Sequence, residues 1–154
     1  HSYVMNHPLT IEFGSRALEI TSEAKVSVAY DAIRMPGIPH PPYIQCKAVW
    51  DTGAMSSVIT PTLARKLGLF SLGLVKMHHA NGDSMVNTYM INLLLPNKME
   101  VSTLYVMEGD MTDNDILIGM DVITLCDFAI TNKDGKTVFS FDIPSTRITD
   151  YTIE

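Results

Sequence analysis

Hydrophobic and polar positions alternate along the chain in short runs, which is the pattern of half-buried β-strands. Two longer runs predict hairpins, because each is split by a dipeptide that favours a tight turn: Asn81-Gly82 within 75–96 and Asp134-Gly135 within 128–143. Further strands are predicted at residues 9–13, 17–20, 24–30, 99–107 and 115–123, with Gly119 interrupting the last.

A single segment has the signals of a helix. Thr60 is suited to the N-cap, Pro61 to the first helical position and Gly68 to the end of the helix. The proline-dense stretch 35–43 cannot join a central sheet, so we predict a surface connection there. The pattern as a whole predicts an all-β domain with one or two short helices.

Composition and charge narrow the possible functions. The 154 residues suit one domain, and the net charge of −6, with no cluster of Lys or Arg, argues against nucleic acid and anionic membranes as partners. The longest apolar runs, such as 91–95, are too short to span a bilayer. Cys46 and Cys126 have neither metal nor redox spacing, so we favour two free buried thiols over a disulfide, and with them a reducing, cytoplasmic location.

The tripeptide Asp51-Thr52-Gly53 is the first candidate for chemistry. It follows the apolar Val49-Trp50 and precedes the β-forming run that ends at Ile59. The Asp51 carboxylate is thereby predicted at a strand end in a mostly buried loop, where an unpaired charge is costly. Asp-Thr-Gly is also an ordinary turn sequence, and alone it does not decide between the two readings.

A second motif strengthens the first. Residues 116–121 read ILIGMD, a buried strand that meets a close-packing point at Gly119. The ordered set of DTGA at 51–54, a hairpin and then ILIGMD resembles the retropepsin-like aspartic proteases over about residues 43–143. The resemblance implies a single-lobe, homodimeric acid-protease β-barrel, which we place at residues 25–154. Residues 1–24 are then an N-terminal β extension of undefined role.

The resemblance also implies a mechanism. Each chain contributes one catalytic aspartate, so the partner of Asp51 is Asp51 of a second copy, and the two carboxylates share a proton and activate water on a peptide or protein substrate. Thr52, Gly53, Ala54 and Gly119 are expected to support the active-site loop. The family needs neither metal nor cofactor.

Two departures from retroviral proteases leave an alternative open. Met55 and Ser56 stand where those enzymes commonly carry acidic residues, and the expected flap, 75–90, has Gly82 as its single glycine. We expect Ala80, Asn81 and Gly82 near the flap tip and in contact with ligand. The alternative is a catalytically inactive, dimeric peptide-binding module with the same fold.

Other residue clusters do not suggest a site. His78 and His79 are adjacent on a predicted strand and point to opposite faces, which disfavours a shared metal. The acidic segment 108–115 lacks the spacing of a calcium loop, and Ser56 and Ser57 lack the surroundings of a serine nucleophile.

Overall fold

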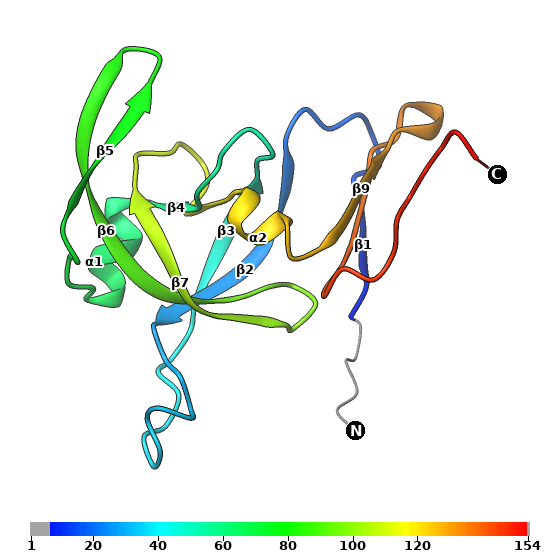
Figure 1. Cartoon of the computed structure of the whole chain (residues 1–154). Helices are drawn as coiled ribbons and strands as arrows, with labels where there is room; N and C mark the ends of the chain where they lie inside the picture. The colour runs from blue at the N-terminus through cyan, green and yellow to red at the C-terminus, as the bar shows by residue number, and fades with distance from the viewer. Residues whose placement is uncertain (1–6, 154) are drawn as a thin grey trace.

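Two β-sheets make up the computed structural model, which describes residues 7–153 (Figure 1). Their strands are β1 (Leu9–Glu12), β2 (Ile20–Val28), β3 (Ile44–Trp50), β4 (Val58–Ile59), β5 (Leu74–His79), β6 (Gly82–Leu94), β7 (Glu100–Glu108), β8 (Ile116–Ile118), β9 (Asp127–Thr131) and β10 (Val138–Asp142). The helical elements are α1 (Pro61–Leu67), α2 (Met120–Ile123) and a 3₁₀ turn, η1 (Lys133–Gly135).

The larger sheet closes into a barrel. Its strand order is β2-β3-β8-β4-β7-β6-β5, and an additional pairing between β2 and β6 joins its two sides. The pairs β3–β8 and β4–β7 are parallel, whereas the other pairs are antiparallel. Among the described strands β5 pairs with β6 alone, and the two form a hairpin that projects from the barrel at the upper left of Figure 1.

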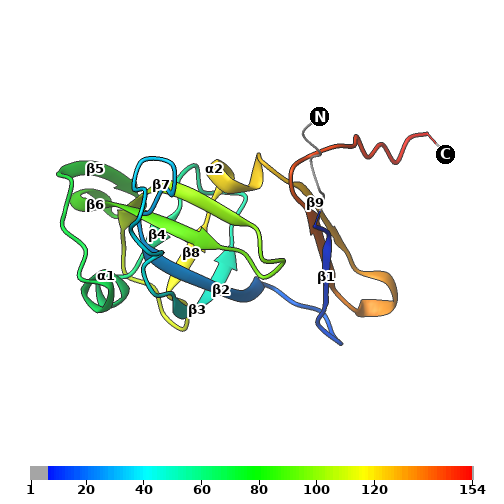
Figure 2. The same ribbon diagram turned by 90° about the horizontal axis from the view of Figure 1, so that it is seen from below.

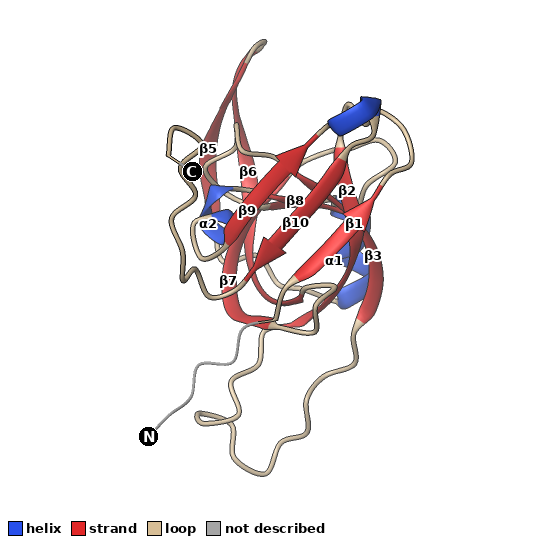
Figure 3. Cartoon of the chain, turned by 90° about the vertical axis from the view of Figure 1, so that its right-hand side faces the viewer, coloured by secondary structure: helices blue, strands red, loops and turns tan. Residues whose placement is uncertain are grey.

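The smaller sheet is antiparallel, in the order β1-β10-β9, and lies beside the barrel (Figures 2 and 3). The Trp50 ring, at the end of β3, lies 5.0 Å from the ring of Phe141 and 5.1 Å from that of Phe139, centroid to centroid. Both phenylalanines are buried, and this aromatic cluster joins the small sheet to the barrel core.

The predicted all-β fold with short helices is confirmed, and the 60–68 helix is confirmed in detail. The Thr60 hydroxyl accepts a hydrogen bond from the Leu63 N–H at 3.2 Å, as an N-cap should, and Gly68 ends the helix in the left-handed region with φ of 66°. The hairpins within 75–96 and 128–143 are also present, as β5–β6 and β9–β10.

Two element predictions are wrong. In place of the predicted strands at 17–20 and 24–30 there is one strand, β2, from Ile20 to Val28, and residues 17–19 and 29–30 lie outside it. Ile20, Ala24 and Val26 are its buried positions and face a single core. The predicted strand at 115–123 stops at Ile118, and Met120–Ile123 turns into α2, with Asp121 in its first turn. The proposed extension, residues 1–24, contributes β1 and the start of β2; residues 1–6 lie outside the described part, and the domain division at residue 24 stays a prediction.

Cys46 and Cys126 are both free, as predicted. Burial raises the pKa of Cys46 to about 12 and that of Cys126 to about 11, so both thiols stay protonated at neutral pH. Across residues 7–153, no helix combines the length and apolar character that a bilayer crossing requires.

Candidate active site

Asp51 follows β3 directly and opens a loop that runs to Ser57. Its backbone N–H donates to the carbonyl oxygen of Ile118 on the neighbouring β8 at 2.9 Å. The Gly53 N–H donates to the Asp51 Oδ1 at 2.8 Å, which fixes the orientation of the half-buried carboxylate. Within residues 7–153 the other carboxylate oxygen, Oδ2, has no hydrogen-bond partner of its own.

Gly119 packs against this loop more closely than any other residue type could. A Cβ built at Gly119 would lie 2.9 Å from the carbonyl oxygens of both Ala54 and Ser56. The next residue, Met120, donates its N–H to the same Ala54 carbonyl at 2.8 Å. The segment 119–120 therefore packs directly against the Asp51 loop.

A second support was not predicted from the sequence. The Asp121 carboxylate accepts hydrogen bonds from the Ser57 N–H at 2.8 Å and the Ser57 Oγ at 2.7 Å. The Ser57 Oγ in turn accepts from the Gly119 N–H at 3.1 Å, and Ser57 is fully buried. The signal lay in the acid that ends ILIGMD, but only the fold shows that its partner is Ser57.

A cavity of about 370 Å³ lies between the Asp51 loop and the β5–β6 hairpin. Its side chains are mostly apolar, and three methionines, Met55, Met77 and Met107, contribute to it. The hairpin supplies Lys76, Met77 and His78. The complete lining is Gly53, Ala54, Met55, Ser56, Val58, Lys76, Met77, His78 and Met107.

The hairpin tip differs from the expectation in two ways. The two turn residues are Ala80 and Asn81, because His79 pairs with Gly82, so the turn lies one position earlier than predicted. The positive φ, 113°, belongs to Gly82 and not to Asn81. Ala80, Asn81 and Gly82 are exposed and do not line the cavity, so their contact with ligand stays a prediction.

The remaining candidates are placed as follows. Thr52 is exposed on the loop, and within the described chain its hydroxyl makes no hydrogen bond, whereas Ala54 lines the cavity. His78 contacts Asp83 across the hairpin, with Nδ1 2.5 Å from Oδ1. No three His, Cys, Asp or Glu side chains in residues 7–153 come together as a metal site would require.

Comparison with solved structures identifies the fold. The chain is similar to a retropepsin-like aspartic protease from Rickettsia conorii, with a TM-score of 0.54, 15% identity, and coverage of 93% of this chain and 99% of that one. It is also similar to the EIAV protease complexed with the inhibitor HBY-793, with a TM-score of 0.49, 13% identity, and coverage of 68% of this chain and 85% of that one. The similarity to the Rickettsia conorii structure confirms the predicted retropepsin-like fold.

The comparison of sequences gives a family match over the part of the chain that holds the Asp51 loop. No curated protein sequence matches the chain. The family model described as "gag-polyprotein putative aspartyl protease" matches residues 44–124, which include Asp51, its loop and Gly119. The chain therefore belongs to the gag-polyprotein aspartyl protease family.

Proposed function

We propose that the protein is an aspartic endopeptidase whose active site combines Asp51 from each of two copies. The observation that carries this proposal is the hydrogen bonding and the position of the Asp51 carboxylate. It is held by the Gly53 N–H through Oδ1, leaves Oδ2 without a hydrogen-bond partner in the described chain, and sits on a loop that borders the 370 Å³ cavity. A carboxylate held in this way is prepared to bind a water molecule and a second acid.

A second copy is needed because one chain offers one such carboxylate. No Asp or Glu among residues 7–153 lines the cavity beside the Asp51 loop, and the sequence has a single Asp-Thr-Gly and no Asp-Ser-Gly. Two carboxylates at close range share one proton, since both cannot ionise comfortably. The ionised one accepts a proton from water as the water attacks the peptide carbonyl, and the protonated one donates to the carbonyl oxygen.

The neighbouring residues suit supporting roles. The exposed Thr52 hydroxyl is available to hydrogen-bond across the two copies. Gly53 and Ala54, which line the cavity, have small side chains and so leave room for the substrate main chain. Gly119 holds the loop from behind through its close contact with Ala54 and Ser56. The β5–β6 hairpin, with Lys76 to His78 on the cavity, is the proposed cover over the substrate.

A dimeric peptide-binding module without activity is the second candidate. The observation that favours it is the hairpin tip, whose residues Ala80, Asn81 and Gly82 do not reach the cavity. A cover that stays open would exclude water poorly and would hold a peptide without cleaving it.

The test compares wild type with Asp51→Asn on a peptide library between pH 3 and pH 9. Asparagine keeps the shape of the side chain but cannot act as acid or base, so cleavage should fall by about 100-fold or more. Asp134→Asn, at an exposed turn of the small sheet, is the matched control and should keep full activity. Wild-type cleavage should be highest below neutral pH and decline when both carboxylates ionise.

Three outcomes separate the candidates. Undiminished cleavage by Asp51→Asn, or a rate that still rises through pH 9, would contradict the proposed chemistry. Saturable peptide binding by both proteins, with no cleavage by either, would identify the binding module.

A further inference from the structure

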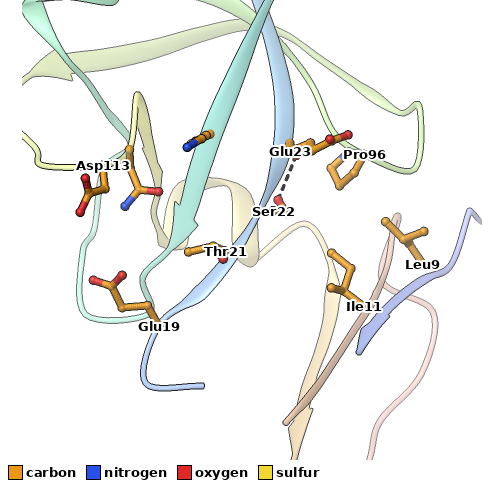
Figure 4. A pocket seen from close by; sticks show the side chains of 10 residues that line it. Leu9, Ile11, Glu19, Thr21, Ser22, Glu23, Pro96 and Asp113 are labelled. Atoms are coloured by element: carbon orange, nitrogen blue, oxygen red, sulfur yellow. Dashed lines mark hydrogen bonds between the residues drawn. The ribbon is translucent and has the colours of Figure 1, made fainter. Parts of the chain in front are cut away.

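A second and larger groove lies between the small sheet and the barrel, away from the Asp51 loop (Figure 4). Its volume is about 720 Å³, and none of its lining residues belongs to the Asp51 loop or to the β5–β6 hairpin. The lining residues are Leu9, Ile11, Glu19, Thr21, Ser22, Glu23, Lys47, Pro96, Asp113 and Asn114. The proposed chemistry at Asp51 makes no use of this groove.

The groove has an apolar side. Figure 4 shows Leu9 and Ile11, from β1, on one side, and Thr21, Ser22 and Glu23, from β2, on the other. Pro96 lies above Leu9 and beside Glu23. Leu9 and Ile11 are half-buried and pack against the core, so they form a fixed apolar surface. An occupant therefore gains by burying apolar side chains here.

The charges of the groove are unbalanced. Glu19, Glu23 and Asp113 contribute three carboxylates, and Lys47 contributes the one lining amine. Across residues 7–153 none of these three carboxylates takes part in an ion pair. The groove is negatively charged at neutral pH, which favours a cationic occupant.

The groove also borders a free strand edge. β1 is the terminal strand of the small sheet, pairs with β10 alone, and has no strand on its other side in the described chain. Such an edge exposes backbone N–H and C=O groups that an added strand can pair with.

We propose that this groove binds an extended cationic segment of a partner protein, which adds to the β1 edge as a further strand. In an extended segment successive side chains point to opposite faces. One alternate set of side chains, Lys or Arg, would then point to the face that Leu9 and Ile11 occupy and so into the groove. Their methylene stems would cover Leu9, Ile11 and Pro96, and their charged ends would reach Glu19, Glu23 and Asp113. The proposal does not depend on catalysis at Asp51.

The experiment uses the full chain and fluorescent six-residue peptides, Val-Lys-Val-Lys-Val-Lys and Val-Glu-Val-Glu-Val-Glu, in anisotropy titrations. The lysine peptide should bind and the glutamate peptide should not. Glu19→Gln combined with Glu23→Gln should weaken binding of the lysine peptide by about five- to tenfold, since each exposed charge pair contributes modestly. Asp134→Asn combined with Asp150→Asn removes the same charge at exposed positions outside the groove and should change the affinity less than twofold.

A backbone-blocked peptide tests strand addition separately from charge. Methylating alternate backbone nitrogens of the lysine peptide, in each of the two registers in turn, removes the donors along one edge and should abolish binding in one register alone. Melting curves of every variant confirm that it is folded.

Four results would overturn the proposal. They are no binding of the lysine peptide, an equal loss in the groove and control variants, binding in both methylated registers, and a change in self-association in the groove variant. The last would identify a second copy of the chain as the occupant.

Discussion

At the scale of single residues, the Asp51 loop depends most on a residue distant in sequence, Gly119. We predict that Gly119→Ala destabilises the protein by about 3 kcal/mol, because the new methyl group would meet three backbone atoms of Ala54 and Ser56 at 2.9 Å. Urea unfolding measures the loss. Gly109→Ala is the control, because its methyl group would meet one Val58 side-chain carbon, and its loss should be smaller. Equal losses in the two variants would contradict the assignment of Gly119 as the loop support.

Asp121 supports the same loop through Ser57. Asp121→Ala removes the acceptor of both the Ser57 N–H and its hydroxyl, so a buried donor loses its partner, and we expect a loss of about 2 kcal/mol in the free energy of unfolding. Asp121→Asn keeps one acceptor oxygen and should lose about half as much. The role assigned to this carboxylate would be wrong if the two variants were equally stable.

At the residue scale, the sequence could nominate site candidates where an acid and glycines form a short motif, and their roles stay predictions. Asp51 to Ala54 and Gly119 stand out because acid, glycine and apolar runs occur in a fixed order. The Ser57–Asp121 pair could not be found, because neither residue type is unusual and their contact spans the interior of the fold. The methionines of the cavity gave no periodic signal, since they come from a loop and two separate strands.

At the scale of elements, the β5–β6 hairpin is either a cover that closes over substrate or an ordinary hairpin, and a substitution at Gly82 distinguishes the two. Gly82 has φ of 113°, a conformation that strains a β-branched residue, whereas a Cβ at this position would meet no heavy atom within 4 Å. If the hairpin closes over substrate, Gly82→Val should reduce the specific activity much more than the melting temperature. If it is an ordinary turn, the melting temperature should fall and the folded fraction should keep its activity. Both quantities are measured on the same sample.

The connection between β2 and β3 is attached to β7 by a titratable side chain, His40. His40 lies with Nδ1 2.7 Å from the Pro41 carbonyl oxygen and Nε2 2.7 Å from Glu100 Oε2 on β7. Both nitrogens donate only when the ring is protonated. The hydrogen bond to the Pro41 carbonyl, with help from Glu100 and against the effect of burial, raises the pKa of His40 above its usual 6.5.

The sign of the pH effect follows from that direction. A pKa raised by folding adds stability that is fully present below pH 6.5 and is lost as the pH rises through the higher value. We therefore expect the stability difference between wild type and His40→Gln to be larger at pH 5.5 than at pH 8.5 in urea unfolding. Glu100→Gln should show a similar but weaker dependence. A difference that grows with pH would contradict the assignment.

Elements were predictable where their signals are local. Helix α1 has a cap and a stop, and each hairpin has an Asn-Gly or Asp-Gly dipeptide in or next to its turn, so all three were found. Helix α2 has four residues, too few for a helical period to emerge from an apolar run. The closure of the barrel by β2 and β6 depends on pairing across the whole fold, which no local pattern contains.

At the scale of the whole molecule, the proposed active site requires two copies. In the last hairpin, β9–β10, Phe139 and Phe141 are buried against Trp50, so they are not exposed to a second copy. The apolar side chain left on the free edge strand β9 is Ile130, which is 40% exposed. We predict that Ile130→Lys weakens dimerisation by about tenfold in sedimentation, with cleavage falling in step with the dimer fraction.

Thr131→Lys is the matched control for this prediction. It places the same charge on the neighbouring residue of β9, whose side chain points to the other face of the strand. Its dimerisation should be closer to that of wild type. A monomeric Ile130→Lys protein with full activity would contradict the two-copy site.

The pairing of β1 with β10 has a consequence for synthesis. Thr10 meets Ser140, 130 residues later in the chain, and their hydroxyl oxygens lie 2.9 Å apart. At about 5–20 residues per second, β1 is synthesised roughly 7–26 seconds before its partner strand. The small sheet, and with it the proposed contact between copies, is therefore the last part of the fold to form. A chain that is still being synthesised would thus be unable to dimerise, and so to cleave other proteins, until β10 has been translated.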